Sequence, residues 1–192
     1  MWHILTSLLF VKLCFTQQFT DETFPNPRTN GYNACGLKSR GYICDPYKLL
    51  SEQERYRLNN DLLQLSRRTS VSESANFCAG KGVDATLLIT KQSDEHLAHR
   101  LSTIWGIDGQ CKKSVIFVLS TSDHKLYYAA AKHTPISAEN IEKIISEQQA
   151  LLNEGKFTTA LTAIFAKFGN TYSETSPNSN QEVTDHGDSG KC

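Results

Sequence analysis

The most restrictive feature of this sequence is the run Ser114–Ser120 (SVIFVLS), which is apolar at every internal position. Successive side chains of a β-strand point to opposite faces of the sheet, so a strand with one face in water alternates between apolar and polar residues. This run does not alternate. It therefore predicts a central strand whose two faces are both covered by other layers of the protein.

The patterns around this run predict the remaining elements of a small α/β or α+β fold. Ala85–Thr90 is a second buried strand, and a turn at Ser122–His124 leads into a third strand from Lys125 to Ala131. A right-handed crossover makes the first two strands parallel and places helices on both faces of the sheet. The sequence thus predicts a sandwich with a βαβ unit, an antiparallel hairpin strand and four helices.

Each predicted helix has an apolar stripe. Ser51 and Glu54 form a capping-box pattern at the start of the first helix, which reaches about Arg68. The second helix is expected to begin at Ser93 and the third at Ser137. The stripes of the last three helices are Leu97, Leu101, Ile104 and Trp105; Ile141, Ile144, Ile145 and Leu152; and Phe157, Leu161, Ile164, Phe165 and Phe168.

Residues 1–16 have the pattern of a secretory signal. The sequence from Ile4 to Phe15 is mostly apolar, and Cys14 and Thr16 fit the −3 and −1 positions of a cleavage site. A buried N-terminal helix is the alternative. A membrane span would need about 20 apolar residues, so this run of about 12 is too short and no other segment approaches that length. We therefore expect a secreted chain, or one at the extracellular face of the plasma membrane, without a transmembrane span.

Three regions follow the predicted signal. Residues 17–44 contain turn and extended-chain signals, such as Phe24–Pro27 and Asn30-Gly31, rather than helix or strand patterns. Residues 45–169 hold the predicted globular domain. Residues 170–192 are rich in Ser, Thr, Asn, Asp and Gly, which predicts a disordered polar tail.

The cysteines fit an oxidising compartment. Four internal cysteines remain after the predicted cleavage, and in a secreted chain they indicate two disulfides with three possible pairings. A zinc site is the alternative, but no CxxC spacing or histidine pair accompanies them. The four are Cys35, Cys44, Cys78 and Cys111. Cys192 is left over, and it either pairs between chains or marks where the chain was cut short.

Sequence distance and topology favour one of these pairings. Cys35 and Cys44 are close in the sequence, and Gly36 and Gly41 let the segment between them fold back. Cys78 and Cys111 each precede one of the two parallel strands, whose starts lie at the same edge of the sheet. We therefore expect Cys35 to pair with Cys44 and Cys78 to pair with Cys111.

Charge and motifs exclude several classes of function. Acidic and basic residues balance at 20 each, so no strong field would attract nucleic acid. The sequence contains neither of the Gly-rich phosphate-binding motifs, and Ser120–Ser122 before Asp123-His124 lacks the elbow of a serine hydrolase. We predict no catalytic residues and no cofactor.

Two groups of side chains in the sequence are of the types that bind metal ions. His96 and His99 stand at i and i+3, but no third ligand accompanies them, so an exposed helix face explains them better. Asp94 and Asp123 follow the two parallel strands, and with Asp45 they could bind a hard cation through carboxylate oxygens. Caps and turns explain Asp94 and Asp123 equally well, so no metal site is predicted.

A longer pattern resembles a known family. Phe24–Arg28 (FPNPR), Asn30–Tyr32, Cys35-Gly36, Cys44–Pro46 and Leu50–Glu54 together resemble the modulator of levamisole receptor family of nematodes. The similarity runs from about Phe24 to Phe168. Members of this family look like extracellular domains of the TPM type, so the resemblance implies a small TPM-like three-layer sandwich.

The resemblance also implies a function. It points to a non-enzymatic accessory protein that binds subunits of acetylcholine-gated receptor channels and promotes their gating. Because some TPM proteins are described as acid phosphatases, a divalent-metal-dependent phosphatase is an alternative, as is a secreted binding domain without a receptor partner. Enzyme-like TPM proteins tend to have a Gly-rich loop after the third strand, where this sequence has Ala129–Pro135 (AAAKHTP).

Overall fold

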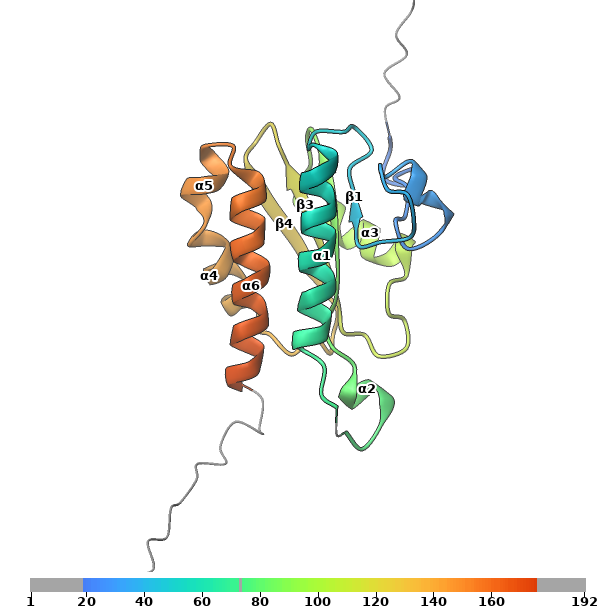
Figure 1. The fold of residues 1–192 in the computed structure, drawn as a ribbon, viewed down its shortest axis with the longest axis vertical. Coiled ribbons are helices and arrows are strands. Elements are labelled where there is room, and N and C mark those ends of the chain that lie inside the picture. Colours follow the sequence, from blue (N-terminus) through green and yellow to red (C-terminus); the bar gives the residue numbers. More distant parts are fainter. Residues whose placement is uncertain (1–18, 73, 176–192) are drawn as a thin grey trace, which may run out of the picture.

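A four-stranded sheet forms the centre of the computed structural model, which describes residues 19–72 and 74–175 (Figure 1). Its strands lie side by side in the order β1 (Ile43–Cys44), β2 (Asp84–Thr90), β3 (Ser114–Ser120) and β4 (Lys125–Ala130). β1, β2 and β3 are parallel, and β4 is antiparallel to β3. Every residue of β2 and β3 is buried, which confirms the prediction of central strands covered on both faces.

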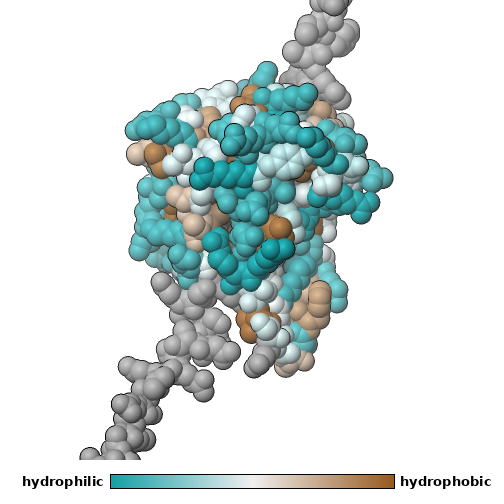
Figure 2. Space-filling view, viewed as in Figure 1, coloured by the Kyte–Doolittle hydropathy of each residue, from teal (hydrophilic) through white to brown (hydrophobic). Residues whose placement is uncertain are grey.

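Helices cover both faces of this sheet. α1 (Glu52–Arg68) and α6 (Phe157–Thr175) pack side by side on one face, with α4 (Ala138–Ser146) and α5 (Gln149–Asn153) beside α6 (Figure 1). α3 (Leu97–Trp105) packs on the other face, against β3 and β4. Hydrophilic side chains dominate the outer surface of the α1 and α6 layer (Figure 2). The expected three-layer α+β sandwich is therefore confirmed.

Alternation along the strands divides the core into two clusters. Leu87, Ile89 and Phe117 face α1 and α6, and the Phe117 ring lies 5.4 Å from that of Phe165. Leu88 and Val118 point the other way and pack with α3. Because each strand contributes to both clusters, neither layer of helices can detach without exposing apolar surface to water.

The start of α1 follows the predicted capping chemistry. Ser51 accepts a hydrogen bond from the Glu54 backbone N–H, and the Glu54 carboxylate accepts one from the Ser51 backbone N–H. The reciprocal pair satisfies two backbone donors that have no partner within the helix. Leu58, Leu62 and Leu65 then lie on the buried side.

The second predicted helix differs from the structure at its start and in its buried face. It begins at Leu97 rather than Ser93, because the Asp94 carboxylate accepts a hydrogen bond from the His96 backbone N–H and holds a turn there. Ile104 is 47 % exposed and does not belong to the buried face. That face is centred on Ala98 and Leu101, which leaves Ile104 at its margin.

The helix count and two boundaries also differ from the prediction. The described residues contain six α-helices instead of four, because the one-turn helix α2 (Phe77–Gly80) precedes β2 and the third predicted helix divides into α4 and α5. α6 continues to Thr175, beyond the predicted end of the domain at residue 169, because a change to polar composition does not by itself stop a helix. The predicted signal at 1–16 and residues 176–192 of the predicted tail lie outside the described residues.

The predicted extended arm, residues 17–44, contains short secondary structure and buried side chains in its described part, which begins at residue 19. It forms the 3-10 helix η1 (Asn30–Asn33) and the edge strand β1, which pairs with β2. Phe24, Leu37 and Ile43 are buried in the two core clusters. A two-residue strand shows no periodicity in the sequence, which explains why the pattern did not predict it.

Two disulfides fasten the less regular parts of the chain. Cys35 is joined to Cys44, which attaches the N-terminal segment to β1. Cys78 is joined to Cys111 across a Cα–Cα distance of 5.2 Å, which attaches α2 to the loop before β3. These are the two pairs expected from the sequence, although Cys78 lies in a helical turn.

Candidate functional site

The chain forms a pocket of about 570 Å³ at the carboxyl ends of β1 and β2. The segment after β1 leads to α1 on one face of the sheet, whereas the segment after β2 leads to α3 on the other face. Connections that diverge in this way leave a crevice between them, and open α/β sheets commonly bind ligands in such crevices. The topology therefore makes this pocket the candidate functional site.

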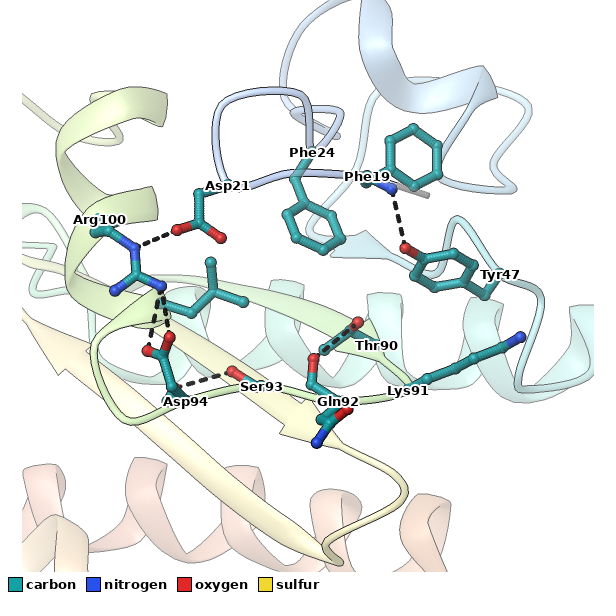
Figure 3. Close-up of a pocket in the computed structure, with 11 residues that line it drawn as sticks. Phe19, Asp21, Phe24, Tyr47, Thr90, Lys91, Gln92, Ser93, Asp94 and Arg100 are labelled. Atoms are coloured by element: carbon teal, nitrogen blue, oxygen red, sulfur yellow. Dashed lines mark hydrogen bonds and ion pairs between the residues drawn. The ribbon is translucent and has the colours of Figure 1, made fainter. Parts of the chain in front are cut away.

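One wall of the pocket is aromatic. The Phe19 ring is stacked on Phe24 at a centroid distance of 5.8 Å, and it meets the Tyr47 ring edge to face at 5.6 Å. The Phe19 backbone N–H also donates to the Tyr47 hydroxyl at 3.1 Å (Figure 3). Lys91 places its ammonium nitrogen 5.6 Å from the centre of the Tyr47 ring, within reach of a cation–π attraction.

The opposite wall is an ion-pair triad centred on Arg100. Its guanidinium donates through Nε to Asp21 and through Nη2 to Asp94, with the latter contact at 2.9 Å (Figure 3). The hydrogen bond from Arg100 holds the pKa of Asp94 below its ordinary value, and the two carboxylates raise the pKa of Arg100. The triad joins the N-terminal segment, the loop after β2 and α3 into one rim.

The loop after β2 forms the floor of the pocket and is held by its own polar groups. The Thr90 hydroxyl donates to the Gln92 carbonyl at 3.4 Å, and the Ser93 hydroxyl donates to the Asp94 carbonyl at 3.0 Å. Together with the aromatic wall, the pocket offers both flat apolar surface and charged groups of each sign. Such a mixture suits a polypeptide segment better than a single small ion.

The three aspartates weighed as metal ligands serve separate structural roles. Asp45 is completely buried and accepts hydrogen bonds from the backbone N–H groups of Leu49 and Leu50 and from Arg55. Asp94 belongs to the triad, and Asp123 accepts a hydrogen bond from the Ser120 hydroxyl at 2.6 Å. Within residues 19–72 and 74–175, no three His, Cys, Asp or Glu side chains gather as a metal site would require.

The other possible ligands and the serine group are also placed apart. The His124 Nδ1–H donates to the Asn153 carbonyl at 2.9 Å and the ring packs against Phe157, so the imidazole is directed away from Ser120. His96 and His99 are exposed on the surface, and His96 lies near Glu95. The sequence pattern of a nucleophile followed by a base therefore does not form a nucleophile–base pair in space.

Sequence reasoning did not find most of the pocket. The rule that ligands bind beyond the carboxyl ends of parallel strands identified the position of Asp94, which does line the pocket. Phe19 and Asp21 were missed because they precede the predicted domain. Tyr47 and Arg100 were missed because nothing in their sequence spacing shows that they meet.

The fold defines a class, the small α+β domains in which helices cover both faces of one four-stranded sheet. Three solved structures share the fold, and their low sequence identities make them evidence for the fold alone. The N-terminal domain of a protein from P. gingivalis is 14 % identical, with 82 % of this chain and 94 % of that chain covered and a TM-score of 0.57. The N-terminal domain of a Corynebacterium glutamicum protein is 11 % identical, with coverages of 77 % and 90 % and a TM-score of 0.52. The BA42 protein of Bizionia argentinensis is 13 % identical, with coverages of 66 % and 83 % and a TM-score of 0.52.

The sequence places the chain in a narrower group than the fold does. The model of the modulator of levamisole receptor-1 family matches residues 19–124, which is more than half of the chain. The chain belongs to this family, as the resemblance of its N-terminal motifs predicted. A comparison with curated proteins finds no significant match. No helix in the described part of the chain is both long and apolar enough to cross a membrane.

Proposed function

We propose that this chain is an extracellular accessory protein that binds a levamisole-sensitive, acetylcholine-gated channel and promotes its gating. The observation that carries the proposal is the span of the family match. Residues 19–124 include every residue that lines the pocket, whereas β4 and the helices α4, α5 and α6 lie after them. The part of the chain that defines the family is therefore the part that builds the pocket.

The cysteine chemistry supports the extracellular location. Both disulfides lie within the family match, and disulfides persist in secreted and cell-surface proteins. Cys35–Cys44 fixes the N-terminal segment, which lines the pocket, to β1. A binding surface held in this way loses little conformational entropy when it meets a partner.

The pocket has the kinds of side chain that form contacts between proteins. Phe19 and Tyr47 are half-buried and offer aromatic surface, while Arg100 and Lys91 offer charge beside it. Aromatic and Arg side chains of this kind are enriched at the centres of protein interfaces. We place the channel's extracellular segment on this surface.

Promotion of gating has a thermodynamic requirement. A partner shifts a closed–open equilibrium only by the ratio of its affinities for the two states. The proposal therefore requires that the chain bind the agonist-occupied open channel more tightly than the closed one. Simple attachment with equal affinity would leave the currents unchanged.

Co-expression with levamisole-sensitive receptor subunits tests the proposal. Agonist concentration–response curves are recorded with and without the chain, and surface expression of the subunits is measured in parallel. Larger currents or a lower half-maximal agonist concentration at equal surface expression would support it. Unchanged curves, with the chain shown to reach the medium or cell surface, would contradict it.

The phosphatase alternative is tested on the same preparation. Release of phosphate from a phosphomonoester is measured with Mg²⁺, with Ca²⁺ and with EDTA. Metal-dependent turnover together with unchanged channel currents would replace the accessory-protein proposal by the enzymatic one.

A further inference from the structure

One edge of the sheet has backbone groups that no other part of the described chain bonds. The Ala131 N–H donates to the Ser114 carbonyl at 2.8 Å, and the His133 N–H donates to the Lys112 carbonyl at 2.9 Å. Alternate residues of an antiparallel strand point toward their partner, so the odd-numbered residues of β4 bond to β3. The N–H and C=O groups of Leu126, Tyr128 and Ala130 therefore point away from the sheet.

At the opposite edge of the sheet, the N-terminal segment covers β1. β1 is only two residues long, and the N-terminal segment lies beside it. The Asp45 N–H donates to the Cys35 carbonyl, and the Gly41 N–H donates to the Pro27 carbonyl. The chain thus covers its β1 edge with its own backbone, while β4 presents a six-residue edge at the other margin of the sheet (Figure 1).

The side chains along β4 permit a close approach. Lys125 and Ala130 are exposed, and Tyr127 is half-buried. The Tyr128 side chain reaches α4, where its hydroxyl donates to the Ala138 carbonyl at 3.3 Å, whereas its backbone N–H and C=O point away from β3. A strand added here would meet small side chains at the Ala129–Ala131 end of β4.

Charge indicates the kind of strand that fits. Lys125 begins β4 and Lys132 follows it, and both ammonium groups are exposed without an ion-pair partner among the described residues. Acidic side chains at the two ends of an added strand would reach them. The Glu142 carboxylate, on α4, is engaged by the Tyr128 hydroxyl at 3.3 Å.

A second copy of the chain fits this edge less well. Antiparallel pairing of two β4 strands about Tyr128 would place Lys125 of one copy opposite Ala131 of the other, at the position next to that copy's Lys132, at both ends of the pairing. Two positive charges at neighbouring positions repel each other, and β4 contains no acidic residue to offset them. The edge therefore favours a partner of opposite charge over self-association.

We propose that β4 is a docking edge for an extended, acidic segment of a partner protein, which adds a fifth strand to the sheet. The backbone of Leu126, Tyr128 and Ala130 supplies the hydrogen bonds, and Lys125 and Lys132 select for acidic ends. This mode of recognition, β-strand addition, gains affinity from main-chain bonds and specificity from flanking side chains. The site is separate from the pocket, so the proposal does not depend on the receptor function.

The test uses the full chain labelled with ¹⁵N and a capped heptapeptide that has Asp and Glu at its ends and alternating Val and Thr between them. Peptide binding should shift the amide signals of Leu126, Tyr128 and Ala130 most strongly. Ala130→Pro removes only an outward N–H, because residue 130 does not bond to β3, and should weaken binding at least about fivefold. Ala130→Val keeps that N–H and should bind within about twofold of the parent.

A second pair of variants does not depend on how the strand tolerates proline. Lys125→Glu/Lys132→Glu should weaken binding about tenfold at low salt, and Arg57→Glu, an exposed residue of α1, should not. The proposal is wrong if the acidic peptide does not bind, if a peptide with lysine ends binds equally well, or if the shifts occur elsewhere. Concentration-dependent self-association through β4 would overturn it as well.

Discussion

At the residue scale, buried charged side chains hold turns of the backbone in place. Asp45 is the clearest case, because its carboxylate is fully enclosed and bonds the backbone N–H groups of Leu49 and Leu50 together with Arg55. A buried ion pair stabilises little compared with an apolar pair, but removing one member leaves an uncompensated charge. The residue therefore holds the turn between β1 and α1, and a metal would have to displace three existing donors.

Asp45→Ala should accordingly lower the free energy of unfolding by about 3–5 kcal/mol, because Arg55 loses its buried partner. Asp123→Ala, at an exposed carboxylate, should lower it by no more than about 1 kcal/mol. Urea denaturation measures both. EDTA or Ca²⁺ should leave the parent midpoint unchanged, and a Ca²⁺-dependent rise that disappears in Asp45→Ala would show that this aspartate is a metal ligand after all.

Asp108 makes a testable link between charge and pH. Burial would raise the pKa of its carboxyl, but hydrogen bonds from Lys81 at 2.5 Å and from the Lys113 backbone N–H outweigh this effect and hold the pKa below its ordinary value of 3.8. A carboxyl with a lowered pKa in the folded state contributes stability above its unfolded pKa. That contribution is lost as the pH falls through the folded-state value.

Asp108→Asn should be less stable than the parent by about 1–3 kcal/mol at neutral pH, and the difference should shrink as the pH falls below about 4. Asn tolerates the left-handed backbone at this position, where φ is +53°, so the variant tests the charge rather than the turn. Urea midpoints at several pH values give the result. A difference that stays constant down to pH 2 would show that the ionised carboxyl is not the source of stability.

At the element scale, the two disulfides act on different lengths of chain. Cys78–Cys111 spans 33 residues of sequence and ties α2 to the loop before β3, whereas Cys35–Cys44 spans nine. In the chain-entropy model, a longer closed loop restricts the unfolded state more. The longer link should therefore contribute more through this effect.

Cys78→Ser/Cys111→Ser should lower the free energy of unfolding by about 3.5–4 kcal/mol under oxidising conditions. Thermal melting measures the loss, and with a reducing agent added to both, the parent and the variant should melt close together. Peptide mapping without reduction should link Cys78 only to Cys111. A variant that melts at the parent's midpoint, or a map that links Cys78 to Cys35 or Cys44, would contradict the pairing.

The elements that could be predicted from sequence are those whose local pattern decides their structure. The uninterrupted apolar run in β3 and the mostly apolar run in β2 indicate buried strands, and the Ser51–Glu54 capping box indicates the start of a helix. β1 is too short for a pattern, and it becomes a strand only because β2 offers it an edge. The start of α3 depends on one side-chain hydrogen bond, from the His96 N–H to Asp94, which competes with helix formation.

At the scale of the whole molecule, the pocket could not be predicted because it is assembled from distant parts of the sequence. Phe19 and Asp21 come from the N-terminal segment, Tyr47 from the segment after β1, and Arg100 from α3. Their meeting depends on the divergence of two connections to opposite faces of the sheet. Family membership, in contrast, was recognisable in local motifs near the N-terminus and is shown by the match over residues 19–124.

The proposed function places the contact with the channel at the pocket. Arg100→Glu tests it, because it reverses the charge at the centre of the triad with Asp21 and Asp94. Arg57→Glu is the matched control, since Arg57 is exposed on α1 in the layer on the other side of the sheet. Both variants are first checked for secretion and for a cooperative thermal transition.

The measurement is the half-maximal agonist concentration of levamisole-sensitive receptors co-expressed with the parent chain or with each variant, at equal surface expression. The parent and Arg57→Glu should lower this concentration equally, whereas Arg100→Glu should lose most of the effect because the rim of the pocket can no longer assemble. Full activity of a folded, secreted Arg100→Glu chain would contradict the role proposed for the pocket and place the contact on another surface.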